Sequence, residues 1–293
     1  MCYYIPCMKS GQALVLGANG MLGRELAEVF LNQNPVLWDR EDLDITDEAA
    51  VERVLGELKP KLIINAAAYT NVDACETDQE ACTKVNGEAV WYLAKAARAI
   101  GAIFAHYSTD YVFDGENEDG YTENDEPKNS VNEYGQSKLL GERLLQEEGA
   151  KGLRYFLIRT SWLFGRYGKC FPSVMLELAK VNNEIKVVSD QQGKPTHARD
   201  LAAATRQLIE GPYESGIYHL VNEPETTWYS FATAIFDAYA AIHPEFKEPI
   251  VKPCATSEFP RPAKRPEYSV LINTKFPPLR PWREALEEYL ADR

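Results

Sequence analysis

The residues best suited to acid–base chemistry are Tyr134 and Lys138, in the segment Tyr-Gly-Gln-Ser-Lys. A separation of four residues places both side chains on one face of a helix, within reach of each other. A free tyrosine titrates near ~10, and a neighbouring ammonium is expected to lower the pKa of Tyr134. The pair therefore predicts a phenol that gives a proton to a carbonyl oxygen while hydride arrives at the carbonyl carbon.

A Tyr-x-x-x-Lys pair also occurs by chance in a chain of this composition, so its context carries the argument. The predicted strand Ile103–Tyr107 ends in Ser-Thr-Asp-Tyr, which places Thr109 just beyond the strand. Parallel sheets bind ligands beyond the carboxyl ends of their strands, where the Thr109 hydroxyl would bond the same carbonyl. The alternative for Thr109 is a strand-end residue that caps a turn. Small residues in the segment 65–70, after another predicted strand, leave room for a cofactor.

A glycine-rich turn, Gly17-Ala-Asn-Gly20-Met-Leu-Gly23, follows the first predicted strand and leads into a helix. Glycines at such a turn let the backbone approach a pyrophosphate, whose charge lies at the helix N-terminus. The spacing is GxxGxxG rather than the usual GxGxxG. The alternative is therefore a tight turn in which Gly23 only permits close packing.

Asp39 ends the second predicted strand, about 20 residues after the glycine turn, which is the usual offset of the acid that bonds the adenosine ribose. Asp39 would disfavour a 2′-phosphate and the adjacent Arg40 would attract one, so the sequence does not separate NADH from NADPH. Alternatively, Asp39 belongs only to the acidic turn Asp-Arg-Glu-Asp-Leu-Asp.

Short apolar runs alternate with helix-length segments in the first half of the chain, a pattern typical of a parallel α/β sheet. The pattern weakens after Gly165, and residues 244–281 are proline-rich and predicted to be loop-like. The predicted strands are 13–16, 36–38, 62–64, 103–107 and 155–158. The predicted helices are 21–31, 48–58 (with Thr46 and Asp47 as start signals), 88–99, 134–146 and 283–290.

These elements predict an α/β fold with a Rossmann-type, doubly wound parallel sheet and a smaller C-terminal substrate-binding domain. The dinucleotide-binding domain is predicted at residues 1–165, with a return segment at 197–222. The smaller domain is predicted at 166–196 and 223–293.

Composition narrows the class of protein. The 293 residues are 45% apolar and 26% charged, as in an ordinary globular protein, with no apolar run of membrane-spanning length. A formal net charge of −13 repels phosphate backbones and anionic headgroups, so neither a nucleic-acid nor a membrane partner is expected. No secretory signal is evident, which predicts a cytoplasmic location. Residues 1–7, before Met8, are either a short tail or a mis-set start.

The six cysteines are scattered and form neither a CxxC pair nor a close Cys/His set, so no zinc site and no disulfide framework are predicted. They are interpreted as small buried apolar groups. The histidines form no cluster and are interpreted as structural: His106, His197, His219 and His243.

Together these motifs resemble the extended short-chain dehydrogenases/reductases, and most of all the dTDP-4-dehydrorhamnose reductase family. The resembling stretches span nearly the whole chain: GANGMLG (17–23), NAAAYTNVDACE (65–76), YSTDYVFDG (107–115), YGQSK (134–138), RTSWLFG (159–165), DQQGKPT (190–196) and RPEYSVL (265–271). The motifs are specific for this family when they occur together, whereas no single motif is. The resemblance implies that NADPH or NADH reduces the 4-keto group of a sugar-nucleotide substrate, dTDP-4-dehydro-L-rhamnose, to give dTDP-L-rhamnose.

The same resemblance implies roles for particular residues. The catalytic set would be Thr109, Tyr134 and Lys138, with Lys138 also bonding the nicotinamide ribose. The pyrophosphate would be lined by Gly20, Met21 and Leu22, and the adenosine by Asp39, Asp44 and Ile45. The cofactor cleft would be lined by Ala68, Tyr69, Thr70 and Tyr107. The sugar nucleotide would contact Asp110 and Trp162.

Two departures separate the chain from related enzymes. Dehydratases with these motifs carry Thr-Asp-Glu at the strand end, whereas Tyr111 here lacks the carboxylate that elimination needs, so reduction is expected and dehydration is not. Some relatives bridge dimers through magnesium held by carboxylates, and Arg199 stands at one of those acidic positions. No metal site is therefore predicted, and monomer and homodimer both stay open.

Two further candidates each have an alternative. Arg265, in a proline-rich segment, would clamp the substrate diphosphate through its fork of donors, or would lie in a solvated loop. Trp162 would stack on a sugar or base, or would belong to the core. Two other functions stay open: a reductase or epimerase of another keto-sugar nucleotide, and a non-catalytic regulatory homologue that binds NADP and a partner protein.

Overall fold

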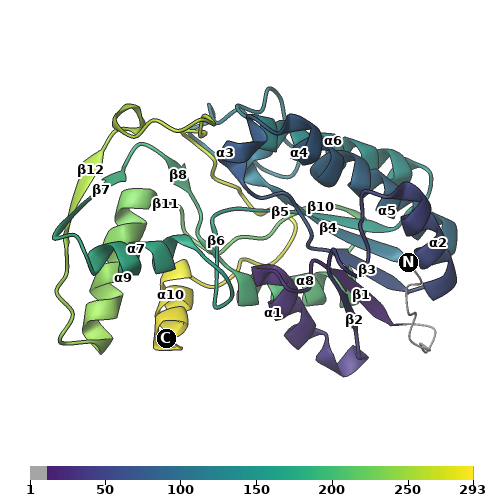
Figure 1. The fold of residues 1–293 in the computed structure, drawn as a ribbon, viewed down its shortest axis with the longest axis horizontal. Helices are drawn as coiled ribbons and strands as arrows, with labels where there is room; N and C mark the ends of the chain where they lie inside the picture. The colour runs from purple at the N-terminus through teal and green to yellow at the C-terminus, as the bar shows by residue number, and fades with distance from the viewer. Residues whose placement is uncertain (1–11, 293) are drawn as a thin grey trace.

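A computed structural model describes residues 12–292, so the segment 1–7 lies outside the described residues. Its centre is a six-stranded sheet with the strand order β10-β5-β4-β3-β1-β2 (Figure 1). All neighbouring strands run parallel. The strands are β1 (Ala13–Leu16), β2 (Val36–Trp38), β3 (Leu62–Asn65), β4 (Ile103–Thr109), β5 (Tyr155–Thr160) and β10 (Gly216–His219).

Helices cover both faces of this sheet. α2 (Glu48–Leu58), α5 (Ala89–Ile100) and α6 (Glu133–Ala150) lie on one face, and α1 (Met21–Val29) and α8 (Ala198–Glu210) on the other (Figure 1). Each face buries its own apolar cluster, because successive side chains of a strand point to opposite faces. The predicted Rossmann-type, doubly wound fold is confirmed.

The strand order reverses at β1, because β2 lies on one side of β1 and β3 on the other. In an open parallel sheet such a reversal leaves a crevice beyond the carboxyl ends of the two diverging strands. The residues that follow β1, β3 and β4 therefore face a common space.

Capping residues determine where the helices begin. The Asp47 side chain accepts a hydrogen bond from the Ala50 amide at 3.0 Å, which confirms the predicted start of α2. The Asn132 side chain does the same for α6, accepting from the Gly135 amide at 2.8 Å. Because α6 begins at residue 133, Tyr134 lies in its first turn.

A third apolar cluster lies outside the sheet, among helices that Figure 1 draws to one side of it. α7 (Phe171–Ala179), α9 (Trp228–Ile242) and α10 (Trp282–Ala291) build it, with Phe231, Trp282 and Tyr289 at most 1% exposed. The sequence did not predict α9, because apolar residues occur all around that helix and leave no amphipathic period.

The prediction that residues 244–281 are loop-like is wrong at β12 (Ile250–Cys254), which pairs in parallel with β7 (Glu184–Val188). Pro253 disfavours a strand when only the local sequence is considered, and the partner strand overrides that preference. Other short elements went unpredicted: α3 (Val72–Cys75), α4 (Gln79–Thr83), a π-helical turn (Lys84–Glu88), β6 (Leu163–Phe164), β8 (Gln192–Gly193), β9 (Thr196–His197) and β11 (Thr226–Thr227).

The prediction of no disulfide is wrong, because a disulfide joins Cys75 and Cys82. The two residues belong to α3 and α4, whose turn brings their Cα atoms to 5.6 Å. Cysteines seven residues apart give no sign of pairing in the sequence unless the turn between them is known. Cys170 and Cys254 are buried free thiols, as predicted.

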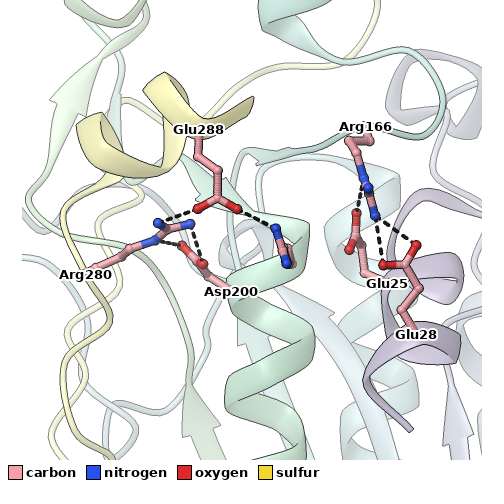
Figure 2. A network of polar contacts seen from close by, with 7 residues as sticks. Glu25, Glu28, Arg166, Asp200, Arg280 and Glu288 are labelled. Carbon is pink, nitrogen blue, oxygen red and sulfur yellow. Dashed lines mark hydrogen bonds and ion pairs between the residues drawn. The ribbon is translucent and has the colours of Figure 1, made fainter. Parts of the chain in front are cut away.

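Two clusters of ion pairs connect the segments outside the sheet to its helices (Figure 2). Arg166 faces α1, with its Nη2 2.8 Å from a carboxylate oxygen of Glu28. Arg280 lies between Asp200 of α8 and Glu288 of α10, at nitrogen–oxygen distances of 2.8 and 2.6 Å. These contacts hold α10 against α8.

Arg199 pairs with Glu288 at 2.7 Å. The absence of a metal stays a prediction, as does the division of the chain into two domains. Within residues 12–292, no helix has both the length and the apolar character needed to cross a membrane.

The pair Arg159–Glu142 is buried between β5 and α6, with both side chains at most 1% exposed. Two parallel hydrogen bonds of 3.0 and 2.7 Å join the two groups. Glu142→Gln leaves the guanidinium buried without its counter-charge, so we expect the free energy of unfolding to fall by about 3–5 kcal/mol in a urea titration. Glu177→Gln, which breaks an exposed pair with Lys180, is the matched control and is expected to change it by less than ~1 kcal/mol. Equal effects of the two variants would contradict this account.

Candidate active site

A cavity of about 780 Å³ opens at the carboxyl ends of β1, β3, β4 and β5. The structure brings every predicted site residue except Arg265 to the lining of this one cavity. Those residues are Gly17, Gly20, Met21, Leu22, Gly23, Asp39, Asp44, Ile45, Ala68, Tyr69, Thr70, Tyr107, Thr109, Asp110, Tyr134, Lys138 and Trp162.

The glycine-rich turn forms one end of the cavity. Gly17 has a φ of +73°, and a Cβ there would lie 2.7 Å from the Ala67 amide nitrogen. A Cβ on Gly23 would overlap the carbonyl of Gly17. α1 begins at Met21, and its N-cap residue Gly20 provides no side-chain cap, so the first amide groups of the helix remain available to an anionic ligand. The turn therefore has the form of a phosphate-binding loop.

Asp39 lies at the far side of this turn, directly after β2. Its carboxylate accepts hydrogen bonds from the backbone amides of Asn19 at 3.0 Å and of Arg40 at 2.8 Å. The exposed Arg40 guanidinium lies 3.9 Å from Asp44. Hydrogen bonds from Thr46 keep the pKa of Asp44 below its ordinary value, so this end of the cavity carries negative charge at neutral pH.

Thr109, Tyr134 and Lys138 meet at the middle of the cavity. β4 ends at Thr109, whose hydroxyl donates to Asp110 at 2.9 Å. Tyr134 and Lys138 come from successive turns of α6, and the amine of Lys138 donates to the carbonyl of Tyr107 at 2.6 Å. The phenol of Tyr107 points to the other face of the sheet, where it bonds Thr205 at 2.8 Å.

The predicted lowering of the Tyr134 pKa is wrong, because the surroundings of the phenol raise it. Burial raises the pKa of Tyr134, the Asp110 charge raises it further, and the Thr109 hydroxyl offsets part of the effect. The amine of Lys138 is directed to a backbone carbonyl and to His106, which explains why it does not dominate the titration of the phenol. The phenol therefore keeps its proton at neutral pH.

Burial shifts the other two ionisable groups of the cavity towards neutrality. It lowers the pKa of Lys138 to about 8, against the charge of Glu142, which raises it. It raises the pKa of Asp110 to about 6, while hydrogen bonds from Ser269 and Thr109 lower it. Both groups thus titrate within reach of physiological pH, a feature common at reaction sites.

Sequence reasoning missed several residues of the cavity. Ser108 and Thr160 line it, and their hydroxyl oxygens are buried without a hydrogen-bond partner among residues 12–292. Buried hydroxyls normally bond a partner, so these two are available to a ligand. Lys169 also lines the cavity and supplies a cation near Trp162. Their positions follow from strand register and loop path, and no local motif marks them.

Trp162 lines the cavity after the end of β5. Its ring stacks on Trp228 with centroids 3.6 Å apart, and its φ is +46°. Trp162 thus both lines the cavity and packs against the third apolar cluster, so the two interpretations of this residue are compatible.

Arg265 does not line the cavity. Its guanidinium donates to Asp73 at 3.0 Å and to the carbonyl of Ala263 at 2.8 Å. It is partly buried rather than lying in a solvated loop, and its contact with a diphosphate stays a prediction.

A doubly wound sheet whose crevice joins a phosphate loop to a Thr/Tyr/Lys set is typical of the short-chain dehydrogenases/reductases, which are nicotinamide-dependent oxidoreductases. The sequence matches the family model described as the RmlD substrate binding domain over residues 11–293. A dTDP-4-dehydrorhamnose reductase of Burkholderia thailandensis is 43% identical over 271 residues, covering 89% of this chain and 90% of that protein. The chain belongs to the dTDP-4-dehydrorhamnose reductase family.

Solved structures agree with this assignment. The crystal structure of dTDP-4-dehydrorhamnose reductase from Bacillus anthracis in complex with NADP has a TM-score of 0.88 at 35% identity, covering 97% of this chain and 100% of that one. A dTDP-4-dehydrorhamnose reductase orthologue from Clostridium acetobutylicum gives 0.87 at 41% identity, covering 96% and 98%. The chain is accordingly an oxidoreductase.

The raised pKa of Asp110 predicts how the stability of the protein depends on pH. An unfolded Asp holds its proton only below about pH 4. Native Asp110 holds it up to about pH 6, so between these values the native protein binds more protons and its stability falls as pH rises. Asp110→Asn removes this titration. We expect its free energy of unfolding, relative to the unchanged protein, to rise by about 3 kcal/mol between about pH 4 and about pH 8.

Urea titrations at both pH values measure the effect. Asp125→Asn is the control, because hydrogen bonds from Thr122 lower the pKa of Asp125 and its variant should lose relative stability as pH rises. A constant difference between Asp110→Asn and the unchanged protein would refute the prediction.

Proposed function

We propose that this protein reduces the 4-keto group of dTDP-4-dehydro-L-rhamnose to give dTDP-L-rhamnose, with NADPH or NADH as the reductant. The observation that carries the proposal is the convergence of Thr109, Tyr134 and Lys138 on the cavity that also holds the phosphate loop. Membership of the family supports this choice of substrate, because relatives named dTDP-4-dehydrorhamnose reductase align with most of the chain.

The cavity fits a dinucleotide at its glycine end. Gly20, Met21 and Leu22 would line the pyrophosphate, with the amides of Met21 and Leu22 as donors, because the Gly20 amide already donates to the Gly17 carbonyl at 3.1 Å and the start of α1 has no side-chain cap. The adenosine would be surrounded by Asp39, Asp44 and Ile45. The rest of the dinucleotide would lie along Ala68, Tyr69, Thr70 and Tyr107. A bound nicotinamide dinucleotide would supply the hydride that adds to the carbonyl carbon.

The chain itself supplies the proton. A tyrosine is protonated at neutral pH and burial raises the pKa of Tyr134 further, so its phenol can donate to the developing alkoxide. Thr109 lies beside Tyr134 and would bond the same substrate oxygen. Lys138 holds its amine at the end of β4, where it would bond the nicotinamide ribose.

The other end of the cavity would take the sugar nucleotide. Asp110 and Trp162 line it and would contact the sugar, and Lys169 offers a cation to the diphosphate. Tyr111 follows Asp110 and carries no carboxylate for elimination, which favours reduction over dehydration. Oligomeric state and cytoplasmic location stay predictions.

A substrate panel tests the reaction. Loss of absorbance at 340 nm is followed with each dinucleotide and with freshly made 4-keto sugars on dTDP and on other nucleotides. The proposal predicts turnover with dTDP-4-dehydro-L-rhamnose and a strong preference for it. Equal rates with a different activated keto-sugar would support the alternative reductase, and no oxidation of either dinucleotide with any sugar would support the non-catalytic homologue.

Tyr134→Phe tests the proton donor. Removing one hydroxyl deletes the acid while leaving the ring in place, so turnover is expected to fall about 10²–10⁴-fold. Dinucleotide affinity, measured by fluorescence titration, should stay within about twofold, because the phosphate loop is unchanged. Tyr92→Phe, on α5, is the matched control and should keep full turnover. Unimpaired turnover of Tyr134→Phe would remove Tyr134 from this role.

A further inference from the structure

Trp162 has an unusual backbone conformation where it lines the cavity. Its φ of +46° lies in the left-handed region, which a bulky side chain rarely adopts. Hydrogen bonds fasten the chain on both sides of this residue. The Ser161 hydroxyl donates to the Lys194 carbonyl at 2.7 Å, and the carbonyl of Trp162 accepts from the Thr196 amide at 3.3 Å. Backbone strain persists only where the surroundings impose it, which happens often at ligand sites, so the conformation indicates a functional demand on the Trp162 side chain.

Trp228, the first residue of α9, stacks on the ring of Trp162. The ring centroids are 3.6 Å apart and the ring planes differ by 10°, so Trp228 covers one face of the Trp162 indole. Thr227 fixes the start of α9, because its side chain accepts a hydrogen bond from the Ser230 amide at 3.1 Å. Trp228 does not line the cavity itself. Its influence on a ligand must therefore pass through the ring that it contacts.

Gly193 makes room for the same indole. A Cβ on Gly193 would lie 2.5 Å from Cε2 of Trp162 and 2.7 Å from its Cζ2 and Nε1, well inside contact distance. Gly193 belongs to β8, which pairs antiparallel with β11, and β11 ends at Thr227, the residue before Trp228. This two-stranded sheet thus holds the glycine and the second tryptophan together around the ring of Trp162.

We propose that Trp228 and Gly193 are positioning residues, which hold the indole of Trp162 in one orientation for contact with the sugar of the sugar nucleotide. An indole that is already fixed loses no side-chain freedom when the substrate binds, so the contact gives more affinity. The inference rests on the proposed function, because that function assigns Trp162 to the sugar and the glycine turn to the dinucleotide. The stack therefore acts on affinity for the sugar nucleotide and not on affinity for the dinucleotide.

Trp228→Leu replaces the flat ring by a side chain that fills space without stacking. The KM for the sugar nucleotide is expected to rise about 3–10-fold, the scale of one aromatic pair, while kcat stays within about threefold and the Kd of the dinucleotide within about twofold. Trp228→Phe, which can still stack, should recover most of the loss. Phe236→Leu is the matched control, because it removes a buried ring from the same helix and should lower Tm without changing KM. A rise in KM below about twofold in Trp228→Leu, or an equal rise in Phe236→Leu, would overturn the proposal.

Gly193→Ala acts on the same indole and leaves Trp228 in place. The added Cβ must displace the ring of Trp162, so the KM for the sugar nucleotide should again rise about 3–10-fold with dinucleotide affinity unchanged. Gly56→Ala on α2 is the matched control, because a Cβ there has no atom within 4 Å, and it should keep the KM of the unchanged protein. Equal KM values for Gly193→Ala and Gly56→Ala would contradict the proposal.

A double-mutant cycle separates positioning through Trp162 from a general effect on the fold. In a Trp162→Leu background no indole remains to be held, so the further substitution Trp228→Leu should change the KM for the sugar nucleotide by less than about twofold. A purely structural role of Trp228 would raise KM by the same factor in both backgrounds. A further change of more than about twofold would therefore overturn the proposal.

Fluorine NMR of the free protein labelled with 5-fluorotryptophan tests the orientation of the ring without substrate or turnover. The chain has five tryptophans, and Trp162→Phe identifies the Trp162 signal by its loss. We expect one narrow Trp162 signal in the unchanged protein and a broadened or divided signal in Trp228→Leu. A signal that is equally narrow in both proteins, or broad in both, would overturn the proposal. Because this measurement needs no reaction, a failure of the stack is distinguished from a failure of the proposed function, which the substrate panel tests.

Discussion

The arrangement of the cavity depends on the close packing of α6 against the end of β4. This contact buries Lys138 and lets its amine bond the carbonyl of Tyr107 at 2.6 Å. Glycines of α6 permit the approach: a Cβ on Gly135 would overlap the Tyr111 carbonyl, and one on Gly141 the Asn86 carbonyl. With the helix at this distance, the first turn of α6 and the residue after β4 share one space. The tyrosine and the threonine are brought together for that reason.

Burial has opposite effects on the acid and the base that share this space. Asp110 holds its proton more tightly than an exposed carboxyl, and Lys138 holds its proton less tightly than an exposed amine. Both shifts arise because a poorly solvated cavity disfavours any charge that lacks a close partner. The arrangement reduces stability at the site, and the apolar clusters on the two faces of the sheet offset that loss. A reaction that moves a proton benefits from groups that titrate near the working pH.

Much of the fold was predictable, because it follows from local signals. The apolar runs of β1, β2 and β3 and the Asp47 cap of α2 are found where the sequence places them. The elements outside the sheet were predicted poorly. α9 is apolar all around and carries no period, and β12 contains Pro253, so each takes its form from the packing around it. The disulfide of Cys75 and Cys82 likewise depends on a turn that no motif announces.

The sequence by itself determined the order of strands and helices in the first half of the chain, the glycine turn and the spacing of the tyrosine and lysine, because periodicity, capping and turn chemistry act over a few residues. Only the tertiary structure decided the protonation of these groups. Burial raises the pKa of Tyr134 instead of lowering it, Arg265 binds Asp73 rather than lining the cavity, and His106 contacts Lys138 across two elements. Burial and long-range contacts set each of these properties, and neither can be deduced from residues that are neighbours in the chain.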